Sequence, residues 1–114
     1  MSYYRVDFST ATNEDLRQSF QITDRAGTPI NLTGAALHMD VADQPGHRAL
    51  QATTDNGLIV LSGAPAGTFE LAVPATLMRG LPPGVYQHDL LLLRGDRTMR
   101  VWSGTLSLAR GVTQ

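Results

Sequence analysis

Apolar and polar residues alternate in several short stretches of this chain, and turn-forming residues separate the stretches. The alternation is clearest between residues 35 and 41, where every second residue is apolar: Ala35, Leu37, Met39 and Val41. Similar short patterns cover 4–8, 16–23, 30–33, 48–53, 58–61, 68–73, 86–93 and 97–108. A period of two, interrupted often by Gly and Pro, favours many short β-strands. The only helical signal is 74–80, which begins with Pro and ends with Gly.

A Pro-Gly pair, Pro83-Gly84, stands one residue before Tyr86, and Tyr86 opens an apolar strand. In immunoglobulin-like sandwiches a Tyr at such a corner packs beneath the entering chain, and its hydroxyl bonds to backbone a few residues upstream. We therefore predict an all-β, immunoglobulin-like β-sandwich of about seven or eight antiparallel strands, with a single helical turn near residues 74–80. Residues 1–114 form one domain, which is long enough to bury a core.

The last two strands are predicted to form a hairpin around a type II′ turn at Gly95-Asp96, where Gly takes the first central position. The resulting register assigns three pairs and Tyr86 to the core side: Leu92 with Met99, Leu90 with Val101, and His88 with Ser103. It assigns three other pairs to the opposite side: Leu93 with Thr98, Leu91 with Arg100, and Asp89 with Trp102. Asp89 then lies diagonal to Arg100, which predicts a surface ion pair. Gly104 is expected to mark a bulge or a close approach of backbone.

The second side of this hairpin is unusually apolar for a solvated sheet. Burying a large apolar side chain contributes roughly 1.5–3 kcal/mol, and exposed clusters of such side chains often mark partner surfaces. We therefore identify Leu91, Leu93, Arg100 and Trp102 as candidate partner-binding residues, with the flat guanidinium of Arg100 able to stack on a partner. The alternative is that the N-terminal segment or the loop at residues 43–47 covers these side chains.

Composition narrows the classes of function. The chain has no Cys, which excludes disulfides and thiolate metal sites, and its net charge of -1 offers no basic excess for a phosphate backbone. No apolar run approaches the roughly 20 residues that cross a bilayer, and the first residues lack the apolar stretch of a signal peptide. We expect no nucleic-acid or membrane partner, and synthesis in the cytoplasm.

Three groups of residues resemble functional sites: a metal site, a catalytic Ser–His pair and an adhesive motif. His38, Asp40, Asp43 and His47 resemble a metal-ligand set, but two of them lie in a loop and no supporting partner is evident, so a solvated polar face is the favoured interpretation. His88 near Ser103 lacks an orienting acid on its side of the strand, because Asp89 points away. Arg94-Gly95-Asp96 is an adhesive tripeptide in a turn where Gly and Asp are favoured anyway. We therefore predict no enzyme activity, no catalytic residue, no metal and no cofactor. A hydrolase that uses His38 or His88 is a third hypothesis.

Five short segments, taken in their order and spacing, indicate a resemblance to a known family. They are 32–34 (Leu-Thr-Gly), 56–59 (Asn-Gly-Leu-Ile), 67–71 (Gly-Thr-Phe-Glu-Leu), 84–90 and 103–113. With these segments the sequence resembles small tail-associated proteins of tailed bacteriophages and prophages. It is similar in particular to the immunoglobulin-like N-terminal domain of phage baseplate upper proteins, from about Phe20 to Thr113. His88 stands where such proteins commonly carry an aromatic residue.

The resemblance implies a structural or adaptor protein of the virion tail or baseplate. It would dock on other tail or baseplate proteins or on itself, and a homo-oligomer is possible. A carbohydrate-binding or adhesive module is the alternative hypothesis. That function requires aromatic side chains aligned on an open face, for which Tyr3, Tyr4 and Trp102 are the candidates.

Overall fold

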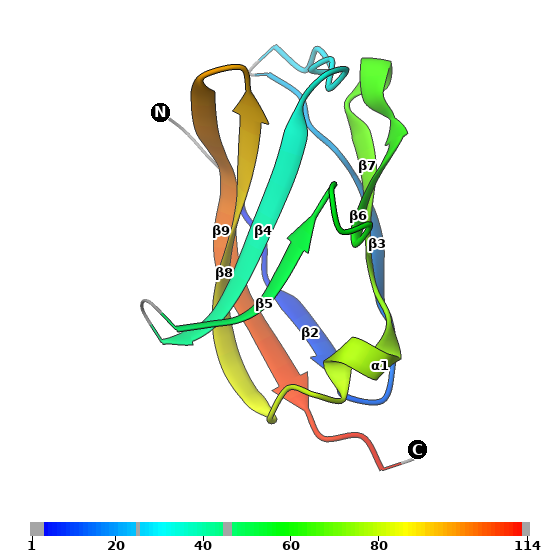
Figure 1. Ribbon diagram of the computed structural model, residues 1–114, viewed down its shortest axis with the longest axis vertical. Coiled ribbons are helices and arrows are strands. Elements are labelled where there is room, and N and C mark those ends of the chain that lie inside the picture. The colour runs from blue at the N-terminus through cyan, green and yellow to red at the C-terminus, as the bar shows by residue number, and fades with distance from the viewer. Residues whose placement is uncertain (1–3, 25, 45–46, 113–114) are drawn as a thin grey trace.

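The computed structural model describes residues 4–24, 26–44 and 47–112, and it places two β-sheets face to face (Figure 1). The described strands are β1 (Tyr4–Arg5), β2 (Phe8–Ala11), β3 (Leu16–Gln21), β4 (Ala36–Gln44), β5 (His47–Thr53), β6 (Ile59–Gly63), β7 (Thr68–Val73), β8 (Gly84–Arg94) and β9 (Arg97–Ala109). A short helix, α1 (Ala75–Met78), and a 3₁₀ turn, η1 (Ala64–Ala66), complete the described elements. None of the described helices is long and apolar enough to span a membrane.

The larger sheet has the order β1-β9-β8-β4-β5, with β2 also paired to β9, and the smaller sheet has the order β3-β7-β6. In an immunoglobulin-like sandwich, β3, β7 and β6 correspond to strands B, E and D. In the same scheme β9, β8, β4 and β5 correspond to strands G, F, C and C′. The predicted fold class, an all-β sandwich, is confirmed.

The direction, bounds and number of some strands differ from the prediction. β1 and β2 run parallel to β9, whereas all strands were expected to be antiparallel. A parallel pair between the first and last parts of a chain has no hairpin link, so local sequence carries no sign of it. The single strand expected at 4–8 is divided into β1 and β2 at Val6-Asp7, and nine described strands replace the seven or eight expected. The expected extended piece at 30–33 belongs to no assigned strand, but Ile30 and Leu32 donate backbone hydrogen bonds to the carbonyls of Ile22 and Ala64, and the isolated bridge Thr23–Pro29 lies beside it.

The core lies between the two sheets, and the strand pattern explains it. Leu37, Met39 and Val41 of β4 are buried, as their alternation predicts, and β7 contributes Phe69 and Leu71 in the same way. The apolar side of β8 is also confirmed, because Tyr86, Leu90 and Leu92 are buried. Every second residue of these strands therefore faces the opposite sheet.

The tyrosine corner is present. The hydroxyl of Tyr86 donates a hydrogen bond to the backbone carbonyl of Pro82, and the Tyr86 side chain is buried. α1 precedes this corner within the expected range, and its Met78 is buried too. The corner thus fixes the path by which the chain leaves the smaller sheet and enters β8 of the larger one (Figure 1).

We expect Tyr86→Phe to lower the free energy of unfolding by about 1 kcal/mol, because it removes the hydroxyl and leaves the buried ring. Urea denaturation measures this change. Val85→Ala is the matched control, since its exposed neighbouring side chain makes a change beyond about 0.5 kcal/mol unexpected. Equal unfolding midpoints for Tyr86→Phe and wild type would contradict the assigned hydrogen bond.

Candidate functional site

The β8–β9 hairpin forms around the predicted turn, but its register changes part of the way along. Gly95 has φ +59°, and no described non-glycine residue has positive φ, which fits a type II′ turn at Gly95-Asp96. Leu92 pairs with Met99 and Leu91 with Arg100, as expected. A register shift between Leu90 and Leu91 then inserts one extra residue into β9. The remaining predicted pairs are therefore displaced by one residue.

This bulge moves Trp102 to the core, so its assignment as a partner-binding residue was wrong. Leu90 pairs with Trp102 instead of Val101, and Trp102 is only 4% exposed. A strand has a period of two, so one inserted residue transfers the following side chains to the other face. In the same way, Asp89 pairs with Ser103 and His88 with Gly104. Met99, assigned to the core side, is 38% exposed.

Trp102 is the centre of an aromatic cluster that links the two sheets. Its ring centroid lies 4.6 Å from that of Phe20 on β3, 5.9 Å from Phe69 on β7 and 6.2 Å from Phe8 on β2. The His88 ring lies 5.1 Å from the Phe8 ring. His88 therefore contributes its own flat ring to this cluster on the inner side of β8.

The other three candidate residues do share the outer face of the larger sheet, the face that points away from the smaller sheet. Leu91 and Leu93 alternate on β8 with buried Leu90 and Leu92, and both are half-buried. Arg100 pairs with Leu91 across the ladder. Val85, on the same face of β8, is 66% exposed. The outer face thus carries apolar side chains along β8 with a cation beside them.

A row of charges crosses the outer face next to Leu91. Asp40 on β4 and Asp89 on β8 stand directly opposite each other, an arrangement that destabilises a sheet when nothing compensates it. Arg48 lies 3.8 Å from the Asp40 carboxylate, and Arg100 lies 3.9 Å from that of Asp89, which is the predicted ion pair. Gln51 also donates a hydrogen bond to Asp40 at 3.0 Å. Each carboxylate therefore has a compensating group on its far side.

A groove of about 490 Å³ runs along this row and continues toward the N-terminal strands. It is lined by Arg5, Asp40, Ala42, Gln87, His88, Asp89, Arg100, Ser103, Gly104 and Thr105. Apart from Arg100, its residues were not among the sequence candidates for partner binding. The alternation of segment 35–41 places Asp40 on this face, whereas nothing local indicates that Arg5 joins it.

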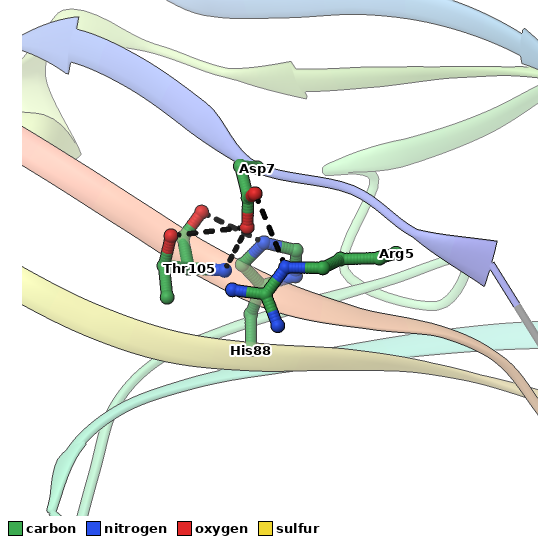
Figure 2. Close-up of polar contacts among 4 residues, drawn as sticks. All are labelled: Arg5, Asp7, His88 and Thr105. Atoms are coloured by element: carbon green, nitrogen blue, oxygen red, sulfur yellow. Dashed lines mark hydrogen bonds and ion pairs between the residues drawn. The ribbon is translucent and has the colours of Figure 1, made fainter.

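Asp7 holds the N-terminal segment to β9 at the end of this groove (Figure 2). Its carboxylate accepts hydrogen bonds from the backbone N–H of Thr105 at 2.9 Å and from the Thr105 hydroxyl at 3.1 Å. Arg5 donates to the second carboxylate oxygen at 3.2 Å. The bond from the Thr105 backbone is the main cause that lowers the pKa of Asp7 below its usual value. β1 and β2 each pair with β9, and this parallel ladder is interrupted between them. At the interruption the Asp7 side chain replaces a backbone carbonyl as the acceptor for Thr105.

Gly104 is the position where this segment approaches most closely. A Cβ at Gly104 would lie 1.8 Å from the backbone oxygen of Val6, so the expected close approach is confirmed. The Val6 backbone N–H also donates to the Ser103 carbonyl at 2.9 Å. The expected bulge lies instead at Val101, between Arg100 and Trp102.

His88 faces the core, with its side chain only 5% exposed. Its Nε2 lies 3.2 Å from the carbonyl oxygen of Thr105 and therefore donates, because a carbonyl only accepts. Its Nδ1 is buried without a hydrogen-bond partner. Neither ring nitrogen contacts the hydroxyl or carboxylate that the hydrolase hypothesis requires. Burial lowers the pKa of His88 below the usual 6.5.

The remaining sequence candidates are dispersed. Asp43 and His47 hydrogen-bond to each other near the tip of the β4–β5 hairpin. Among the residues that the structure describes, no group of three His, Cys, Asp or Glu side chains could hold a metal ion. The Arg94 side chain folds back onto the Asn31 carbonyl. Tyr3 and the side chain of Tyr4 lie outside the described residues, so of the three candidate sugar-binding aromatics only Trp102 is placed, and it is buried.

No protein-family model and no curated protein sequence matches this chain. Solved structures do match it. An endo-β-1,4-mannanase from Thermotoga petrophila aligns over 91% of this chain and 18% of its own length, with a TM-score of 0.53 and 13% identity. A family 123 glycoside hydrolase from Clostridium perfringens aligns over 95% of this chain and 23% of its own, with a TM-score of 0.31 and 8% identity. The chain thus spans less than a quarter of each enzyme, and the likeness to the mannanase shows the fold alone.

We expect Gly104→Ala to lower the free energy of unfolding by about 1–3 kcal/mol or more, because the methyl group would overlap the Val6 carbonyl. Gly80→Ala is the control, since a Cβ there meets nothing closer than 3.4 Å. It should remain within about 1 kcal/mol of wild type. A Gly104→Ala variant as stable as Gly80→Ala would contradict the close approach.

His88 should make the fold sensitive to mild acid. Below about pH 6.5 the unfolded chain protonates this ring, while the folded chain resists protonation because its pKa is lowered. Stability is therefore full above the unfolded pKa and decreases as the pH falls toward the folded pKa. Urea midpoints at about pH 7.5 and about pH 5.5 test this. We expect a smaller drop for His88→Phe than for wild type, and equal drops would exclude His88 as the cause.

Proposed function

We propose that this chain is a non-enzymatic structural or adaptor domain of a phage or prophage tail, and that it docks on another tail or baseplate protein through the outer face of its larger sheet. The observation that carries the docking surface is the juxtaposition on that face of apolar side chains and a charged groove. Val85, Leu91 and Leu93 lie on that face of β8, with Gln87 and Asp89 between Val85 and Leu91, and Arg100 stands opposite Leu91 on β9. The assignment to a virion rests on the resemblance of the sequence to phage tail proteins.

This combination has the anatomy of a protein–protein interface. Such interfaces have an apolar centre with a polar rim, and charges of both signs fix the orientation of the partner. The outer face carries Asp40 and Asp89 between Arg48 and Arg100, so a partner must present its own charges in a matching order. The surface is therefore suited to a specific folded partner.

The first experiment locates the protein. Phage particles are induced from the bacterium that carries the gene and purified, and tail fractions are analysed by quantitative mass spectrometry. We expect this chain at a fixed stoichiometry to the other tail proteins. Its absence from intact particles would contradict the virion assignment.

The second experiment tests the surface. In co-expression with the tail proteins encoded by the neighbouring genes, we expect the double variant Leu91→Ser, Arg100→Glu to bind its partner at least about tenfold more weakly, a loss of ~1.4 kcal/mol. Val60→Ser is the matched control, because Val60 is 49% exposed on the smaller sheet. Both variants must unfold at wild-type-like urea concentrations. Equal binding by the two variants would place the docking surface elsewhere.

A further inference from the structure

The unpaired strand edges of the sandwich differ in how they are protected. Natural sheets blunt free edges with bulges, short strands, Pro or charges, because a regular free edge recruits another strand. The register of β5 with β4 shifts at Ala42, and that of β6 with β7 shifts after Val60. β1 and β2 are short and separated from each other. Among the described residues, only β3 is a regular strand with a free edge.

β3 pairs with β7 alone, in an unbroken register from Leu16–Val73 to Gln21–Thr68. Just after β3, Ile22 donates its N–H to Gly67 and accepts a hydrogen bond from Ile30, so its backbone groups point toward the β7 side. Backbone groups alternate in direction along a strand. Those of Arg17, Ser19 and Gln21 therefore point to the free edge. Arg17 is the only charged residue of the strand.

A cleft of about 370 Å³ opens beside the end of this edge, between β3 and the β1–β9 side of the larger sheet. Phe20, Ile22, Val101 and Trp102 form much of its wall. Phe20 is only half-buried, and the indole Nε1 of Trp102 is buried without a hydrogen-bond partner.

We propose that the free edge of β3 pairs with β3 of a second copy of this chain, antiparallel about a twofold axis at Ser19. Ser19 then exchanges backbone hydrogen bonds with Ser19 of the second copy, and Arg17 does so with Gln21 of the second copy. The two smaller sheets become one continuous sheet of six strands, three from each copy. This surface is separate from the outer face of the larger sheet, so the inference does not depend on the proposed function.

The sequence of β3 fits itself in this register. Its only charge, Arg17, meets a neutral Gln, so no like charges face each other. On the inner side, Gln18 of the second copy comes to lie next to Phe20, at the mouth of the cleft. A second copy thus covers the half-buried Phe20 ring at this mouth.

An interface made by one strand edge is small, so we expect a dissociation constant in the micromolar range or weaker. Sedimentation velocity over a concentration series up to about 1 mM measures it. Hydrogen exchange followed by NMR gives a residue-level test, because the outward amides of Arg17, Ser19 and Gln21 should become protected as concentration rises. The emission of Trp102, the single Trp of the chain, should change over the same range.

Charge substitutions at the twofold axis test the register. Ser19 is exposed, and in the dimer it faces its own copy, so Ser19→Asp alone should weaken association at least tenfold. Ser19→Arg should weaken association less, because Glu70 lies opposite it on β7. An equimolar mixture of the two variants should associate more tightly than either alone. Ser62→Asp, on the other edge strand of the same sheet, is the matched control and should leave dimerisation unchanged.

Ser19→Pro is a second test, since it removes an outward N–H and leaves the ladder to β7 intact. We expect a folded monomer. A wild-type chain that stays monomeric at about 1 mM would overturn the proposal, and so would a mixture of Asp and Arg variants that does not associate. Binding of a strand from a different protein to β3, with no self-association, would also overturn it.

Discussion

The bulge at Val101 is the constraint on which the rest of this sandwich depends. β9 pairs with β8 on one side and with β1 and β2 on the other, so any shift in its register is transmitted to both neighbours. The extra residue turns Trp102 inward, where its ring contacts Phe20 and Phe69 of the smaller sheet. It also brings Gly104 to the inner side, and only a residue without a side chain leaves room there for the Val6 carbonyl.

The same register shift determines which residues of β9 lie on the outer face. Because Trp102 leaves that face, Ser103 and Thr105 line the groove in its place, and Thr105 meets the carboxylate of Asp7. The outer face consequently has fewer apolar side chains and more polar ones than an unbulged register would produce. Val85, Leu91 and Leu93 of β8 are its larger apolar side chains, with the small Ala36 and Ala42 beside them on β4, and its charges are spread over neighbouring strands. In the docking that we propose, the order of charges would therefore contribute more to the choice of partner than apolar area does.

Local patterns were sufficient for most of the fold. The alternation of β4, the Pro-Gly-Val-Tyr corner and the Gly95-Asp96 turn each depend on residues close in sequence, and all three are observed. The bulge could not be predicted, because the register without a bulge gives as regular an alternation of apolar and polar residues as the observed register with one. What decides between them is whether Trp102 finds aromatic neighbours, and those neighbours are distant in sequence.

The candidate site was predictable to the same extent and for the same reason. The register between the turn and the bulge is the predicted one. It contains Leu91, Leu93 and Arg100, which therefore lie on the predicted face. Asp7 and Arg5 join β9 through a parallel ladder nearly a whole chain length away, and no spacing of residues announces such a pair. Sequence alternation thus assigns faces within a hairpin, whereas contacts between the two ends of the chain require the folded molecule.

The two surfaces of this protein are geometrically compatible. The proposed pairing through β3 would extend the smaller sheet, whereas the proposed docking face belongs to the larger sheet, which packs on the other side of the core (Figure 1). A twofold dimer of this kind presents two identical docking faces on one rigid body. When both faces meet sites on a symmetric assembly, the second contact forms at a high effective concentration and strengthens the first. By this argument a weak strand-edge contact and a polar groove, each small alone, would strengthen each other in the assembly that we propose.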